Sequence, residues 1–219
     1  MRTMTRPASA FSFLAVFLFA VVLIHSQPSH AAVAPTEGAR ALVQSLSDEA
    51  TALLNEPNAA PEKRVEAFRG LLRKYFASAA IGKWVLGRYW RQATDAERSE
   101  YLRLFEDYIV YGYVKRFGAY SGEKLSIMRA ANNDKTSVTV FSEFVRPGGE
   151  KPIMVDWRVG HDADRFKITD VVVEGTSLSQ TLRSDFASTI HQGGGNVESL
   201  LVVLREKVAQ LKTDLGISS

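Results

Sequence analysis

The chain has 219 residues, of which 46% are apolar; it contains no cysteine and carries a formal net charge of +3. Arg2 and Arg6 stand at the extreme N-terminus, so without them the net charge falls from +3 to +1. This near-neutral balance argues against a nucleic-acid partner, and the missing cysteines exclude a disulfide scaffold. The composition predicts one globular domain.

Residues 1–31 have the three-part layout of a secretory signal peptide. Arg2 and Arg6 precede an apolar run over residues 10–24, and small residues follow around Ala31. The apolar run is shorter than the roughly 20 residues that a membrane-spanning helix needs. We expect cleavage after Ala31, with an uncleaved membrane anchor as the alternative, and a single exported domain over residues 32–219.

Helical periodicity fills the first part of this domain, residues 36–120. Apolar residues recur at intervals of three and four over 36–55 and again over 61–76. Thr94 and Glu97 have the spacing of a capping box, which predicts the start of a long, aromatic-rich helix.

Beyond residue 120 the apolar period changes from 3.6 to 2. Four segments within 121–175 alternate polar and apolar side chains, and turns rich in Asn, Asp and Gly separate them. Such short connections predict antiparallel neighbours. Two further helices are expected over 176–213. The fold class is therefore α+β, with a four-stranded antiparallel sheet covered by several helices.

The segment 170–195 brings a serine, an acid and a histidine close together in sequence, which raises the question of a catalytic triad. Ser177 and Asp185 are eight positions apart on the expected helix, more than two turns, so they cannot hydrogen-bond directly. His191 falls at the end of this helix, where it suits the helix dipole, and Ser177 is best placed as the N-cap. We expect no enzymatic activity.

Metal ligands are also scarce in the sequence. Outside the leader only His161 and His191 remain, and neither has a second ligand at a useful spacing. We expect neither a metal nor another cofactor. An exported, apolar-rich domain without reactive groups is typical of a protein that binds an apolar ligand.

Two motifs in this sequence resemble the signatures of the MlaC / toluene-tolerance family. "VLGRYWRQATDAERSEYLRLFEDYIVYGYVKRF" (85–117) is similar to a Leu-Gly-x-x-Trp turn followed by a Thr/Ser-x-x-x-Arg helix. "ITDVVVEGTSLSQTLRSDFASTI" (168–190) is similar to a strand ending in Asp-Val-x-Val-Glu-Gly-x-Ser-Leu, followed by a helix with Arg-x-x-Phe. The resemblance covers roughly residues 39–211.

This resemblance implies a periplasmic carrier of an ABC-type system, which shuttles phospholipid between an outer-membrane lipoprotein complex and an inner-membrane transporter complex. It also implies a twisted, NTF2-like sheet with a cavity between sheet and helices for the acyl chains. Thr176 and the run Thr181-Leu182-Arg183 depart from the family's common residues. These departures suit the related HpnM branch, which accompanies hopanoid biosynthesis, as well as a phospholipid carrier.

The expected lipid-binding residues are apolar or aromatic side chains on both sides of this cavity, together with one cation for the strand-to-helix corner or a lipid headgroup. They are Trp84, Leu86, Trp90, Phe105, Tyr108, Tyr111, Val140, Phe144, Val155, Trp157, Val171, Val173, Leu178 and Arg183. Each side chain is equally compatible with ordinary core packing. An exported protein-interaction module without a ligand is the alternative from another functional class.

Overall fold

The computed structural model describes residues 34–56, 59–116, 120, 122–163 and 165–217. The predicted signal peptide over residues 1–31 lies outside them. Within the described ranges, none of the helices combines the length and the hydropathy that a membrane span requires.

Four helices precede the sheet, and the first, second and fourth lie close to their predicted positions. They are α1 (Pro35–Leu54), α2 (Pro61–Tyr75), α3 (Ser78–Leu86) and α4 (Asp95–Arg116), with a short 3₁₀ helix η1 (Gly87–Arg91) after α3. The predicted capping box is confirmed, because the Glu97 N–H donates to Thr94 Oγ1 at 3.2 Å and the Thr94 N–H donates to Glu97 Oε2 at 2.7 Å.

The sheet is an antiparallel meander whose strands lie in sequence order. Its strands are β1 (Lys124–Asn132), β2 (Ser137–Val145), β3 (Ile153–Asp162), β4 (Arg165–Val173) and the two-residue β5 (Thr176–Ser177), and a 3₁₀ turn η3 (Pro147–Gly149) joins β2 to β3. The four predicted strands are confirmed, and β5 adds a short fifth at the edge beside β4.

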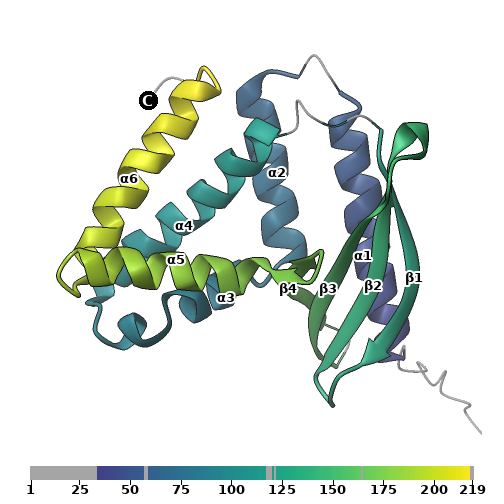
Figure 1. Cartoon of the computed structure of the whole chain (residues 1–219), viewed down its shortest axis with the longest axis horizontal. Coiled ribbons are helices and arrows are strands. Elements are labelled where there is room, and N and C mark those ends of the chain that lie inside the picture. Colours follow the sequence, from purple (N-terminus) through teal and green to yellow (C-terminus); the bar gives the residue numbers. More distant parts are fainter. Residues whose placement is uncertain (1–33, 57–58, 117–119, 121, 164, 218–219) are drawn as a thin grey trace, which may run out of the picture. The chain divides into compact units, whose positions relative to one another are not determined.

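Two capped helices close the chain, α5 (Leu178–Gln192) and α6 (Val197–Asp214). The Ser177 hydroxyl accepts the Gln180 N–H at 3.1 Å, which confirms Ser177 as the N-cap of α5. Figure 1 shows α1 beside the sheet, α2 between the sheet and α4, and α6 beyond α4.

Buried apolar side chains form two separate cores. The first, here called the helical core, is built from α2 to α6; its members with at most 2% exposure include Val85, Leu86, Tyr101, Val110, Ile190, Leu200, Leu201 and Leu204. The second, here called the sheet core, joins one face of the sheet to α1 and α2; its members are Ala39, Val43, Leu46, Leu71, Tyr75, Val138, Val140, Val155, Trp157, Val159 and Ile168.

Candidate functional site

One face of the sheet is apolar, and it is packed most tightly near the β1–β2 and β3–β4 turns. Val138, Val159 and Ile168 are cross-strand neighbours in this region, and each is 0% exposed. Gly38 of α1 approaches so closely here that a Cβ would lie 2.3 Å from the ring of Phe166. The helix backbone therefore rests directly on the sheet, and this end is closed.

The opposite end of the same face is only half-buried. Leu125 pairs with Phe144, Phe144 pairs with Ile153, and Val173 lies beside Val155 in the adjoining row. All four of Leu125, Phe144, Ile153 and Val173 are partly exposed members of the sheet core. We call these four residues the open end of the sheet.

The burial of α1 decreases in parallel with that of the sheet. Ala39 and Val43, in the first half of the helix, are 0% exposed, whereas Ala50 and Leu53 in the second half are half-buried against the sheet core. Helix and sheet are therefore close-packed at one end and leave apolar surface partly uncovered at the other.

A polar pair lies between the two ends of the sheet core. The Trp157 Nε1–H donates to Ser142 Oγ at 3.0 Å, and this hydroxyl donates to the Val155 carbonyl at 2.7 Å. Because both side chains satisfy their hydrogen-bonding groups within the protein, the indole ring is fixed in orientation. It presents a rigid apolar plane on the inner face of β3.

The two cores meet along α2, where Phe68 and the C-cap residue Phe76 are half-buried against both. An ion cluster fastens α2 to α4: Arg69 contacts Glu106 and Asp107 at 2.8 Å each, and Arg73 contacts Glu106 at 2.8 Å. Burial alone would raise the pKa of Glu106, but hydrogen bonds from Arg73 and Arg69 hold that pKa below its ordinary range. The cluster is thus charged at neutral pH.

The β4–α5 corner is organised by Asp170, a carboxylate that is 7% exposed. Its oxygens accept hydrogen bonds from the hydroxyls of Ser177 at 2.6 Å and Ser179 at 2.7 Å, from the Ser179 N–H at 3.1 Å, and from Arg158 at 3.1 Å. Ser177 donates to this carboxylate while it caps α5. Its hydroxyl is therefore engaged in structure, not in an array with Asp185 and His191.

Arg183 joins α5 to the end of α3. Its guanidinium donates to the Trp84 carbonyl and lies over the Trp84 ring, 4.6 Å from the ring centroid. Gly87 follows with φ +60°, and a Cβ there would lie 2.9 Å from the guanidinium carbon. Gly87 of the first motif and Arg183 of the second motif are therefore close neighbours, and the missing side chain of the glycine leaves room for the guanidinium.

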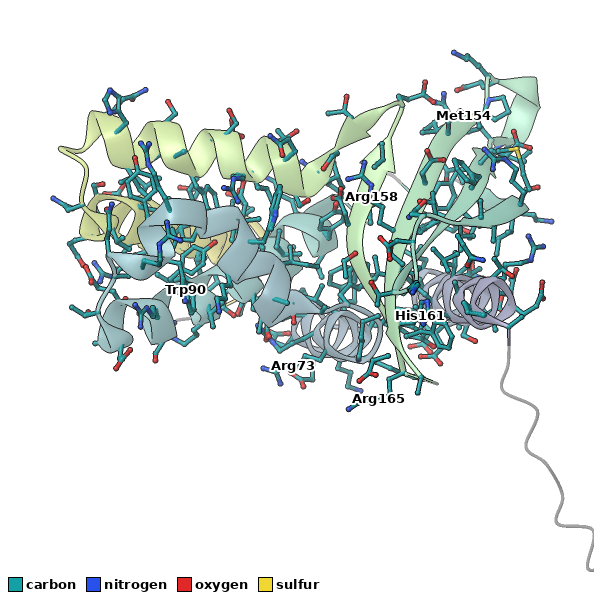
Figure 2. The ribbon with its side chains drawn as sticks, turned by 90° about the horizontal axis from the view of Figure 1, so that it is seen from below. Arg73, Trp90, Met154, Arg158, His161 and Arg165 are labelled. Carbon is teal, nitrogen blue, oxygen red and sulfur yellow. The ribbon has the colours of Figure 1, made fainter. Side chains whose placement is uncertain are left out.

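An open pocket of about 530 Å³ separates this helix pair from the outer face of β3 and β4. Its walls include Ile81 and Trp84 of α3, Arg158 and Asp170 of the strands, and Gln180 of α5. Figure 2 shows Arg158 between the strands and the start of α5. Its wall combines an ion pair and several hydroxyls with apolar side chains of α3, and it lies on the face of the sheet opposite the sheet core.

The residues predicted to line a lipid cavity fall into three groups. Val140, Phe144, Val155, Trp157, Val171 and Val173 belong to the sheet core or pack against it. Leu86, Trp90, Phe105, Tyr108 and Tyr111 belong to the helical core or pack against it. Trp84, Leu178 and Arg183 lie where α3 and the first turns of α5 adjoin. The structure therefore distributes these residues over two cores and the start of α5 beside α3, and their role in lipid binding stays a prediction.

Sequence reasoning missed the polar centre of the corner and the apolar residues of the open end on β1 and β3. The sequence predicts Asp170 only as part of the last strand, although hydroxyls at 177 and 179 are a local signal for a capped helix start. Leu125 and Ile153 follow the same alternation as their neighbours. The alternation of polar and apolar residues predicts on which face of the sheet a side chain lies. It does not predict where along that face the side chains become less buried.

Comparisons with known proteins match this chain to one family. A family model described as MlaC protein matches residues 44–206. The intermembrane phospholipid transport system binding protein MlaC of Haemophilus influenzae is 21% identical over 145 residues, which cover 65% of this chain and 67% of that protein. The phospholipid-binding protein of Ralstonia solanacearum, solved in complex with a phospholipid, superposes with a TM-score of 0.66 at 24% identity, over 79% of this chain and 98% of that one. The superposition shows a shared fold.

Proposed function

The chain belongs to the MlaC family, and from this premise we propose that it is a periplasmic carrier that binds a phospholipid by its acyl chains. It shuttles this lipid between the outer and inner membranes for an ABC-type transport system. Its partners are an inner-membrane transporter complex and an outer-membrane lipoprotein complex. The name of the Haemophilus relative and the phospholipid in the Ralstonia structure support this assignment.

The observation that carries the proposal is the loss of packing along the sheet core. The side chains with 0% exposure in both walls, Ala39 and Val43 of α1 and Val138, Val159 and Ile168 of the sheet, gather toward one end, whereas Leu125, Phe144, Ile153 and Val173 at the other end are half-buried. A protein that fills its own core gains stability by closing such a surface. Hydrocarbon from a guest molecule would cover the open end, Leu125, Phe144, Ile153 and Val173, without any change in the closed end.

Energetics favour acyl chains as the guest. Each buried CH₂ group contributes about 0.8 kcal/mol, so one or two chains are held firmly by apolar contact alone. Among the predicted lipid-binding residues, Phe144, Val171 and Val173 are the ones that are half-buried on the apolar sheet face. Phe68 and Phe76 offer a second apolar border where the two cores adjoin.

The proposed carrier performs no reaction and needs no cofactor. Ser177 is engaged by Asp170 and Gln180 at the start of α5, so its hydroxyl has a structural use. The cargo itself takes the place of a cofactor. The cargo is either a phospholipid or the hopanoid of the HpnM branch. The mass of the lipid that co-purifies with the protein decides between them.

The test is native mass spectrometry of the protein purified without detergent, with two matched substitutions. Val173→Trp fills space at the open end, so we expect lipid occupancy to fall about tenfold while the free energy of unfolding changes by less than about 1 kcal/mol. Val138→Trp overfills the closed end of the same face, where the native side chain is 0% exposed. It should cost about 1–3 kcal/mol of stability and reduce lipid binding only through loss of folded protein.

Two results would contradict the proposal. A wild-type protein with no bound species in any preparation favours the ligand-free interaction module. If both variants lose lipid and stability equally, Val173 is an ordinary core residue and the cargo is bound at another place.

A further inference from the structure

From the middle of α2 to the start of α4, all charged residues of the sequence are basic. Residues 67–94 include six lysines or arginines and no aspartate or glutamate. Lys83, Arg88 and Arg91, at the end of α3 and in η1, are all exposed. Figure 2 looks toward this side of the protein, where Trp90 lies among the helices, away from the strands.

Cations and tryptophans are interleaved on this surface. Lys83 Nζ lies 5.7 Å from the Trp90 ring centroid, and Arg98 Cζ lies 5.6 Å from it. Arg183 contacts the second tryptophan, Trp84, which is 46% exposed and is thus one of the largest apolar groups that the described residues present to solvent. A tryptophan in contact with a cation forms an amphipathic pair, because it combines an apolar ring with a charged group.

The charge on this surface is not neutralised within the protein. Among the described residues, no carboxylate lies within ion-pair distance of Lys83, Arg88, Arg91 or Arg183, whereas arginines elsewhere, such as Arg205, have acidic partners. Of the two acids that begin α4, Asp95 pairs with Arg98, and Glu97 is used in the capping box. Exposed Lys83, Arg88 and Arg91 are therefore available to an external partner, whereas the Arg183 guanidinium already donates to the Trp84 carbonyl.

We propose that Lys83, Trp84, Arg88, Arg91 and Arg183 form a docking surface for an anionic phospholipid bilayer. Anionic headgroups supply the negative charge that this surface lacks, and the headgroup region is the environment that half-exposed tryptophans favour. An acidic protein would satisfy the cations, but it would leave the Trp84 ring without the mixed polar and apolar surroundings that a headgroup layer provides.

Docking to a bilayer does not depend on where the cargo is held. A surface that brings the carrier to a bilayer would act during loading or release, whatever the identity of the lipid inside. Vesicle binding by the surface and lipid occupancy of the sheet core are measured separately, so failure of one is distinguishable from failure of the other.

The experiment measures binding of the purified protein to vesicles of phosphatidylcholine alone and of phosphatidylcholine with 30% phosphatidylglycerol, by co-sedimentation at low and high salt. We expect binding to the anionic vesicles only, and weaker binding as salt screens the charges. The triple variant Lys83→Gln/Arg88→Gln/Arg91→Gln should bind about 100-fold more weakly, because each cation near an anionic surface contributes about fivefold.

A matched control removes the same charge elsewhere. Lys124, Lys135 and Lys151 are exposed and lie on or beside the sheet, outside this surface. Lys124→Gln/Lys135→Gln/Lys151→Gln should retain the wild-type affinity within about threefold, since these cations lie too far from the bilayer to contribute fully.

Tryptophan fluorescence provides a local readout. The chain has three tryptophans; Trp157 is 9% exposed and Trp90 is half-buried, so a blue shift on adding anionic vesicles reports mainly on Trp84. Trp84→Phe should keep binding within about threefold and lose the blue shift. Absence of binding, equal binding to neutral vesicles, equal weakening in both triple variants, or a blue shift that survives Trp84→Phe would each overturn the proposal.

Discussion

The helical core and the sheet core use the same kinds of side chain but differ in how completely they are closed. In the helical core, Phe186 meets Tyr101 edge-on at 6.3 Å and Phe105 at 6.4 Å, with interplanar angles of 84° and 90°. The Tyr101 hydroxyl donates to the Gly82 carbonyl at 2.9 Å, and burial raises the pKa of this phenol. In the sheet core, Val138 and Val159 are fully buried, whereas Phe144 is only half-buried.

This difference teaches which part of the protein supplies stability and which part can accommodate a guest. A closed aromatic cluster with satisfied polar groups has one favourable arrangement. A partly covered apolar face has surface left to bury when a ligand arrives. The same Phe→Ala substitution should therefore reduce mainly the stability when it is made in the helical core, and mainly the lipid occupancy when it is made in the sheet core.

The largest effect is expected in the helical core. Phe186→Ala removes a ring that is 6% exposed and contacts three other rings, so it should lower the free energy of unfolding by about 3–5 kcal/mol. Chemical denaturation followed by circular dichroism measures this loss. The folded fraction should keep its full lipid occupancy in native mass spectra. A loss of lipid from the folded protein would show that the two cores do not divide their roles.

An intermediate effect is expected where α2 crosses α4. Glu106→Gln removes the charge that Arg69 and Arg73 share and should lower the free energy of unfolding by about 2 kcal/mol at neutral pH. Because the folded protein holds the Glu106 pKa below its ordinary range, the wild type has this contribution at and above the ordinary pKa. The contribution is lost as pH falls through the lowered folded pKa.

The pH dependence of unfolding therefore checks the ion cluster. The difference in unfolding free energy between wild type and Glu106→Gln should be full at pH 7 and shrink toward zero below about pH 4. Exposed Glu206 on α6 offers a control, since Glu206→Gln should leave stability within about 0.5 kcal/mol of wild type at both pH values. A difference that does not change with pH would exclude charge as the origin of the effect.

The smallest effect on stability is expected at the open end of the sheet. Phe144→Ala matches Phe186→Ala chemically, but the ring is half-buried, so the cost should be about 1 kcal/mol. Lipid occupancy should instead fall severalfold, because the ring provides apolar contact to the guest. The ratio of lipid loss to stability loss in the two variants is the sharpest measure of the division between the cores. A cost as large as that of Phe186→Ala would indicate that Phe144 serves packing alone.

The features that could be predicted from sequence are those that neighbouring residues determine. Thr94 and Glu97 are three positions apart, so their reciprocal hydrogen bonds follow from the pattern itself. The N-cap at Ser177 and the alternation along β2 and β3 are local in the same sense, and the α+β class follows from the change of period at residue 120.

The features that escaped prediction depend on residues far apart in the chain. Periodicity identifies Phe105 and Val155 as inward-facing, but it does not show that they enter different cores. The strand β5 forms because Thr176 and Ser177 pair back onto β4, a tertiary arrangement that two residues cannot encode alone. The expected cavity wall stays a prediction, and periodicity alone does not show whether its residues assemble into one surface.

The site shared by Gly87 and Arg183 constrains how this chain can change over evolutionary time. The guanidinium occupies the volume that a methyl group at position 87 would take, and the backbone there has φ +60°. Two mutations would have to arrive together for either residue to be replaced without cost. We expect these two positions, 96 residues apart in the sequence, to be inherited as one unit, and to covary wherever descendants of the same ancestor depart from this pair.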